Sequence, residues 1–156
     1  MIRLFGSAVL SVIFVGVLSA QTQLQTSAPE SAAIAAVEAA LKSRVDVWNR
    51  GDLEGVMAGY WHSKQLTFIS NSGETRGWER VLNRFREIYQ YGGNQMGKLG
   101  ISYVEPIHLL GPDTAYADGK WQRTMPDGKQ LHGTFTLIFR EFPEGWLVVH
   151  EQSCSE

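Results

Sequence analysis

Two charged residues in the C-terminal half of the chain, Arg123 and Glu151, lie in stretches whose side chains alternate as in β-strands. Between residues 114 and 124, one face of the alternation carries Ala115, Ala117, Gly119, Trp121 and Arg123. Side chains alternate between the two faces of a strand, and small residues suit a face that a helix covers closely. We therefore expect Trp121 and Arg123 to point into the protein, where an aromatic ring and a fixed positive charge could bind a ligand.

Glu151 is the carboxylate that could take part in proton transfer. In the stretch 146–153 it shares one face with Leu147, Val149 and Ser153, while the other face carries Trp146, Val148, His150 and Gln152. The alternation alone leaves open which face is internal. A carboxylate enclosed by apolar side chains can serve as a general acid or base, whereas an ion pair with Arg123 would give it a structural role.

The four histidines are not spaced as metal ligands, so we expect no metal site. His132 and His150 lie on stretches that should pair, which would allow a pocket with two histidines; a hydrogen-bonded structural role is the alternative for each. The sequence contains no nucleophile elbow, phosphate loop or dinucleotide fingerprint, and we expect no cofactor.

The N-terminal half must position these residues with helices. Apolar residues spaced by three and four predict a helix over about 30–49, and Asp52 should cap a second one that extends to Tyr60. A strand is expected at 66–70, closed by the turn 71–73. A third helix is expected over about 77–91, with an apolar stripe turned inward and Arg80, Arg84 and Glu87 facing water.

Four long strands are expected in the second half, at 101–110, 114–124, 131–142 and 146–153. They are separated by short turn signals rich in glycine, proline and aspartate. Three helices followed by a meandering antiparallel sheet make an α+β domain.

Many aromatic residues occur in the helical half of the chain, and core packing accounts for most of them. Pockets are largely apolar with few polar groups, so some of these residues should line one. The expected ligand-binding residues are Trp48, Tyr60, Phe68, Trp78, Tyr89, Trp121, Arg123 and His132, and the expected catalytic residue is Glu151.

Length, charge and cysteine content limit the classes of protein to which this chain can belong. The 156 residues suit one domain, and a net charge of −2 argues against a nucleic-acid partner, which would need a basic surface. The single cysteine, Cys154, excludes an intramolecular disulfide framework and a zinc site built from several cysteines.

The first twenty residues have the layout of a secretory signal peptide: Arg3, an apolar stretch over 8–18, and small residues up to Ala20. The apolar stretch is about half of the ~20 residues that span a bilayer, so we expect no permanent membrane span. We expect cleavage near Ala20, a disordered lead-in at 21–29, and a secreted or periplasmic protein.

Four segments, in this order and spacing, resemble the nuclear transport factor 2-like (NTF2-like) superfamily. They are Trp48 to Glu54, Gly77 at the start of the third helix, Gly111 to Ala115, and Trp146 to Ser153. Within that superfamily the chain is most similar to the SnoaL-like group and to the uncharacterised domain of unknown function 4440. The resemblance covers residues 30–154 and implies a cone-shaped α+β fold, with three N-terminal helices packed on a curved, mainly antiparallel sheet.

The resemblance also implies a pocket between the concave sheet face and the helices. Analogy with the kinase association domains of this superfamily places Glu151 inside and His150 on the convex face. Ketosteroid isomerase-type members have an aspartate base near the end of the first strand, and the stretch 67–71 has none, so isomerase activity is not carried over. Relatives commonly dimerise through the convex face, where we expect Tyr116, Gln122, Trp146, Val148 and His150; a homodimer is therefore expected.

Three functions remain open. The first is a SnoaL-like domain that binds a small, largely apolar molecule in its cone. The second is a cofactor-free isomerase, dehydratase or cyclase that uses Glu151 or a histidine as acid or base. The third is a non-catalytic oligomerisation module, because this fold supports many unrelated functions.

Overall fold

The computed structural model describes residues 27–91, 96–103 and 106–156. The expected signal peptide and residues 21–26 of the expected lead-in lie outside them. Residues 27–29, also expected in the lead-in, instead form the cap and first turn of a helix. No helix in the described ranges is long and apolar enough to cross a membrane.

The first helix, α1 (Ala28–Asn49), begins with a capping box. The backbone N–H of Ser27 donates to the Glu30 carboxylate at 2.8 Å, and the Glu30 N–H donates back to the Ser27 hydroxyl at 3.4 Å. These two bonds satisfy backbone donors that the first turn leaves free. The chain reverses at Gly51, whose φ of 77° lies in the left-handed region that glycine adopts without strain.

Two shorter helices follow. Asp52 caps α2 (Leu53–Ala58) by accepting from the Gly55 N–H at 2.8 Å, as its position before an apolar run predicts. The third helix, α3 (Trp78–Arg86), continues into one wider π-helical turn, η1 (Glu87–Tyr91). The three expected helices are therefore present.

The sheet has seven strands: β1 (Thr67–Ser70), β2 (Gly73–Arg76), β3 (Lys98–Tyr103), β4 (His108–Gly111), β5 (Thr114–Thr124), β6 (Gln130–Phe142) and β7 (Gly145–Ser155). Their order is β2-β1-β7-β6-β5-β3, and β4 also pairs with β5. The pair β1–β7 is parallel and the other pairs are antiparallel. The α+β class with a mainly antiparallel sheet is confirmed.

Two strand assignments differ from the prediction. The single strand expected at 101–110 is two strands, because β3 pairs with residues 119–124 of β5 and β4 pairs with residues 114–116. β2 was not expected, because Gly73 was assigned to a turn; the hairpin instead continues to Arg76 and pairs β2 with β1.

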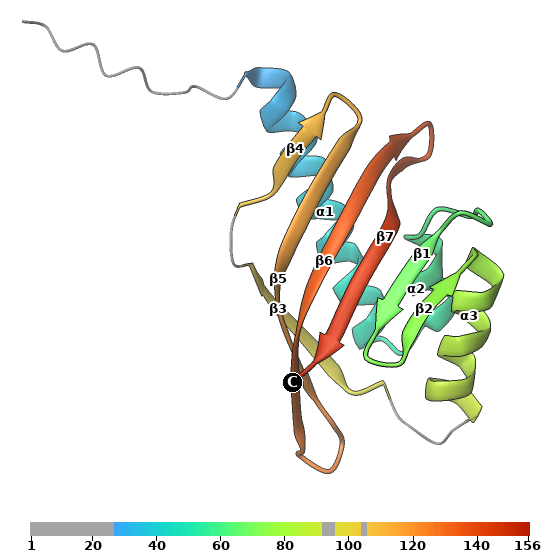
Figure 1. The fold of residues 1–156 in the computed structure, drawn as a ribbon. Helices are drawn as coiled ribbons and strands as arrows, with labels where there is room; N and C mark the ends of the chain where they lie inside the picture. Colours follow the sequence, from blue (N-terminus) through green and yellow to red (C-terminus); the bar gives the residue numbers. More distant parts are fainter. Residues whose placement is uncertain (1–26, 92–95, 104–105) are drawn as a thin grey trace, which may run out of the picture.

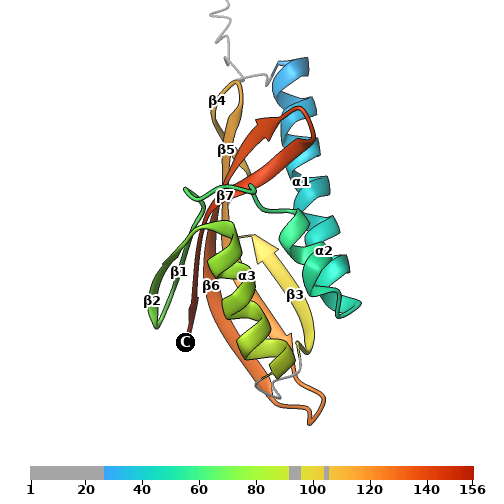
Figure 2. The same cartoon turned by 90° about the vertical axis from the view of Figure 1, so that its right-hand side faces the viewer.

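The helices lie on one side of the sheet. In Figure 1 the strands β4 to β7 pass in front of α1, and the turned view in Figure 2 shows α1 and α2 together on that side. The helix α3 contacts α2 and β2 (Figure 2). The buried apolar core fills the space between the layers, with Val37, Met57, Val81, Leu137 and Phe139 among its least exposed members.

A β-bulge in β7 changes which side chains face the helices. Phe139 of β6 pairs with Val148, but its neighbour Ile138 pairs with His150, so Val149 is an extra residue. Before the bulge, Trp146 and Val148 are buried in the core, with exposed fractions of 7% and 0%. The expectation that these two residues lie on the convex face is wrong, because strict alternation does not hold across a bulge.

Candidate ligand-binding site

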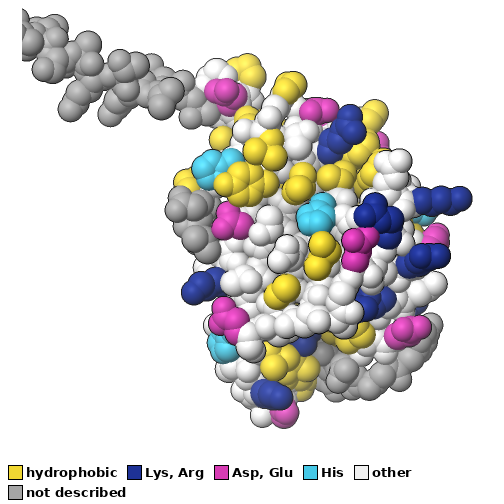
Figure 3. Space-filling view, viewed as in Figure 1, with side chains coloured by type: hydrophobic (Ala, Val, Ile, Leu, Met, Phe, Trp, Pro, Cys, Tyr) yellow, Lys and Arg dark blue, Asp and Glu magenta, His cyan; other side chains and the backbone are white. Residues whose placement is uncertain are grey.

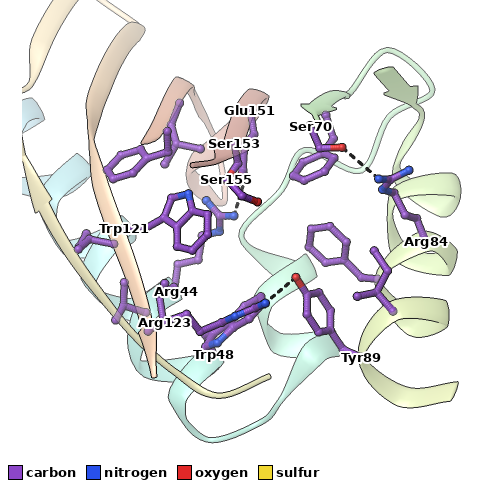
Figure 4. A pocket seen from close by; sticks show the side chains of 18 of the residues that line it. Arg44, Trp48, Ser70, Arg84, Tyr89, Trp121, Arg123, Glu151, Ser153 and Ser155 are labelled. Atoms are coloured by element: carbon purple, nitrogen blue, oxygen red, sulfur yellow. Dashed lines mark hydrogen bonds and ion pairs between the residues drawn. The ribbon is translucent and has the colours of Figure 1, made fainter. Parts of the chain in front are cut away.

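A cavity of about 440 Å³ lies between α1, α3 and the sheet (Figure 4). Its walls are mainly aromatic and aliphatic, and the aromatic members are Trp48, Phe68, Phe85, Tyr89, Trp121 and Phe135. Serine hydroxyls and three arginines also line it. A volume of this size falls within the range of about 300–1,000 Å³ that is typical of small-molecule pockets.

The aromatic wall is held by edge-to-face contacts. The rings of Trp48 and Tyr89 are 5.1 Å apart at 81°, and those of Phe85 and Tyr89 are 5.9 Å apart at 83°. The indole N–H of Trp48 donates to the Met96 carbonyl at 3.2 Å. These contacts fix the ring orientations, because edge-to-face packing matches the positive ring edge to the negative ring face.

The end of α1 is attached to the strand that forms the next part of the wall. The Asn49 amide donates to the Leu99 carbonyl at 2.9 Å, and its oxygen accepts from the Leu99 N–H at 2.7 Å. Both bonds are made to β3, whose Leu99 and Ile101 line the cavity. Asn49 therefore sets the distance between α1 and this strand.

Trp121 lies across the neighbouring strand β6 because residue 133 is a glycine. A Cβ atom built on Gly133 would be 2.0 Å from the Cys154 carbonyl oxygen and 2.3 Å from the indole ring, too close for any side chain. The indole N–H donates to the Thr134 carbonyl at 3.2 Å. The small residue and the hydrogen bond together give Trp121 its place in the wall.

A buried charged cluster forms one part of the cavity surface. The Arg44 guanidinium donates to the Glu151 carboxylate at 2.6 Å, and their side chains are 15% and 9% exposed. The Tyr60 hydroxyl donates to the same carboxylate oxygen, Oε2, and accepts from Arg44. Oε2 thus receives both bonds, while Oε1 accepts none from the described residues.

Two members of this cluster, Tyr60 and Arg44, have raised pKa values. Burial raises the pKa of the Tyr60 hydroxyl well above the ordinary tyrosine value; Arg44 opposes the rise and Glu151 adds to it. Burial alone would lower the pKa of the Arg44 guanidinium, but attraction to Glu151 and Tyr60 outweighs it and leaves that pKa raised. At neutral pH the phenol is therefore a hydrogen-bond donor and the guanidinium is charged.

Solved structures of other proteins resemble the fold of this chain over most of its length. The chain matches an NTF2-like protein of unknown function from Shewanella oneidensis at 29% identity and a TM-score of 0.70, over 77% of this chain and 97% of that one. It matches an NTF2-like superfamily protein from Salmonella enterica at 20% identity and a TM-score of 0.64, over 80% and 92% of the two chains. The chain belongs to the NTF2-like superfamily.

A third solved structure is also similar, whereas family models and curated proteins give no match. An NTF2-like protein from Streptomyces avermitilis, proposed to be a dehydratase, matches over 81% of this chain and 97% of its own at 14% identity, with a TM-score of 0.63. No family model matches the chain, and no curated protein does. The finer resemblance to the domain of unknown function 4440 stays a prediction.

The structure brings most of the predicted site residues of this NTF2-like chain together. Trp48, Phe68, Tyr89, Trp121, Arg123 and Glu151 line the cavity. Tyr60 is fully buried behind the cavity wall and reaches the site through its bond to Glu151.

Two predicted site residues lie elsewhere. Trp78 packs its ring 4.3 Å from that of His62, and its indole N–H donates to the Met57 carbonyl. His132 is exposed and lines a separate hollow beside Lys120. The register places His150 opposite Ile138, and its Nδ1 is hydrogen-bonded to the Thr67 hydroxyl at 2.5 Å; this fits the structural role given as the alternative to a pocket with two histidines.

Two arginine predictions are also wrong. The partner of Glu151 is Arg44, whereas the Arg123 guanidinium donates to the Tyr89 hydroxyl at 3.0 Å. Arg84, expected to face water, lines the cavity, because the β1–β2 hairpin extends beside α3 and supplies two hydroxyls, those of Ser70 and Ser72.

Arg44 was missed although the sequence holds a signal for it. It follows Leu41 by three residues and precedes Trp48 by four, so it shares the apolar face of the first helix. A charged residue within an apolar helical stripe indicates a buried partner. In the described part of the chain, no three His, Cys, Asp or Glu side chains gather closely enough to hold a metal ion.

Proposed function

We propose that this domain binds a small, largely apolar molecule in its cavity. The observation that carries the proposal is the aromatic wall around about 440 Å³, in which Trp48, Tyr89 and Trp121 are held by ring contacts and hydrogen bonds. A preformed apolar cavity binds with little reorganisation, because its side chains need no further ordering.

Titration with 1-naphthalenemethanol, a neutral aromatic probe, tests this function through tryptophan fluorescence. We expect binding of one probe per chain. Ile101→Trp, which places an indole in the cavity, should weaken binding at least about tenfold. Leu110→Trp is the matched control, because Leu110 is 60% exposed and outside the cavity lining. Absent binding, or equal binding by both folded variants, would refute the proposal.

General acid–base catalysis by Glu151 is a second candidate function. The carboxylate lines the cavity, and Arg44 and Tyr60 hold Oε2 while Oε1 accepts no bond from the described residues. Exchange of the acidic C–H protons of 2-tetralone in D₂O, followed by NMR, tests it. Wild type should accelerate exchange and Glu151→Gln should not; equal rates would leave Glu151 a structural role.

We also propose export, to the periplasm or outside the cell, because residues 1–20 have the layout of a signal peptide. Protein purified from its own host should begin at or near Gln21 by mass spectrometry. An intact N-terminus on protein in the soluble cytoplasm would contradict this prediction.

Homodimerisation through the sheet face that points away from the helices is a further proposal. Figure 3 shows apolar side chains on this face among histidine, acidic and basic ones. Ile138 and Leu147 alternate with buried neighbours and supply part of this apolar surface. Sedimentation should give twice the chain mass, and Leu147→Lys should give the monomer mass; a monomeric wild type would refute the dimer.

A further inference from the structure

The cavity holds more positive than negative charge. Arg44, Arg84 and Arg123 all line it, and Glu151 is the one acidic residue among the described residues of its lining. Glu151 is already paired with Arg44. The cavity therefore carries two uncompensated cations, although the whole chain has a net charge of −2.

Of the two cations without an acidic partner, Arg123 makes fewer hydrogen bonds to the protein. Its guanidinium donates one hydrogen bond, to the Tyr89 hydroxyl, and no acidic side chain of the described residues pairs with it. Its Nε atom is buried and has no hydrogen-bond partner. The Nε atoms of Arg44 and Arg84 are buried without partners too, so the distinguishing donor of Arg123 is Nη2, which donates to none of the described residues and is open to a ligand in the cavity.

Aromatic rings hold this guanidinium in place. It lies 5.3 Å from the centre of the Tyr89 ring and 6.0 Å from that of Trp48. Both rings also belong to the apolar wall (Figure 4). A ligand whose apolar body contacts this wall would therefore bring any attached group within reach of Arg123.

We propose that the ligand is an organic carboxylate: an apolar, ring-sized body whose acid group pairs with Arg123. The inference rests on the proposed binding function and adds the charge of the ligand. The planar guanidinium matches a carboxylate with two parallel hydrogen bonds, and the attraction is stronger in an apolar cavity than in water.

Arg84 provides the comparison within the same cavity. Its Nε is also buried without a partner, but its Nη2 donates to the hydroxyls of Ser70, at 3.0 Å, and Ser72. Arg84 therefore has two hydroxyl acceptors for its hydrogen bonds, whereas Arg123 has one, the phenol oxygen of Tyr89. Figure 4 shows the two arginines on different sides of the cavity, Arg123 beside Tyr89 and Arg84 beside Ser70.

Two probes of equal size test the proposal by calorimetric titration: 1-naphthylacetate and the neutral 1-naphthylacetamide. Wild type should bind the acid at least about tenfold more tightly than the amide. Arg123→Gln should abolish this preference, measured as the ratio of the acid and amide dissociation constants within each variant, while Arg84→Gln removes the same charge and should retain the preference. Arg123→Lys, which keeps the charge without the planar fork, should retain part of it.

Each result separates this inference from the proposed binding function. If wild type binds the amide as tightly as the acid, the cavity binds apolar molecules but the carboxylate inference is wrong. If neither probe binds, the binding function itself fails. If Arg84→Gln, and not the Arg123 variants, removes the preference, the assignment of the acid group to Arg123 is overturned.

Discussion

Replacement of Arg44 by methionine should destabilise the protein far more than the loss of an ordinary surface charge. The guanidinium and the Glu151 carboxylate are 2.6 Å apart, and both side chains are largely shielded from solvent. Methionine keeps the apolar stem of Arg44 but leaves Glu151 buried with Tyr60 as its hydrogen-bond donor. Breaking a buried pair costs about 3–5 kcal/mol, a large share of the roughly 5–15 kcal/mol that stabilises a typical domain.

Urea unfolding followed by tryptophan fluorescence measures this cost, and a double-mutant cycle isolates the interaction. Glu151→Gln should restore part of the stability lost in Arg44→Met, because it removes the isolated charge. Lys42→Met is the control: its pair with Asp46 is also 2.6 Å long but 77% and 50% exposed, and should be worth only about 0–1 kcal/mol. An Arg44→Met cost no larger than the control, or purely additive effects, would refute the reasoning.

Three further predictions test other parts of the structure. The raised Tyr60 pKa stabilises the fold fully below the ordinary tyrosine pKa of about 10, and this contribution falls as the pH rises above it. Between about pH 9 and about pH 11, the free energy of unfolding measured with urea should therefore fall more for wild type than for Tyr60→Phe. Equal decreases would contradict this. Gly133→Ala should cost at least about 1–3 kcal/mol and shift the Trp121 emission, because the new Cβ would be 2.0 Å from the Cys154 carbonyl oxygen and 2.3 Å from the indole ring. Gly100→Ala, with nothing within 4 Å, should not shift it. Asn49→Ala should cost about 1–3 kcal/mol in urea and weaken probe binding through loss of its two bonds to β3; unchanged stability would contradict this role.

Local patterns predicted the elements whose packing is regular. The alternation over residues 114–124 placed Trp121 and Arg123 in the cavity wall correctly, because β5 pairs with β6 without a register shift. The apolar spacing over 30–49 likewise located the first helix, and its capping box extends it to Ala28. In these elements each residue's face follows from its position in a constant period.

Features that depend on distant parts of the chain were beyond a local pattern. The bulge at Val149 reverses the alternation, so Trp146 and Glu151 face the same side although their positions differ by an odd number. The partner of Glu151 lies 107 residues away in the sequence, and only the packing of α1 on the sheet brings Arg44 to it. Arg84 entered the cavity lining because the β1–β2 hairpin is longer than a turn.

A crystal structure of the protein with 1-naphthylacetate would test the central claim most directly. The account predicts electron density in the cavity, with the ring against Trp48 and Trp121 and the carboxylate paired with Arg123. An empty cavity at a saturating concentration of the probe, or density only on the face of the sheet away from the helices, would contradict it.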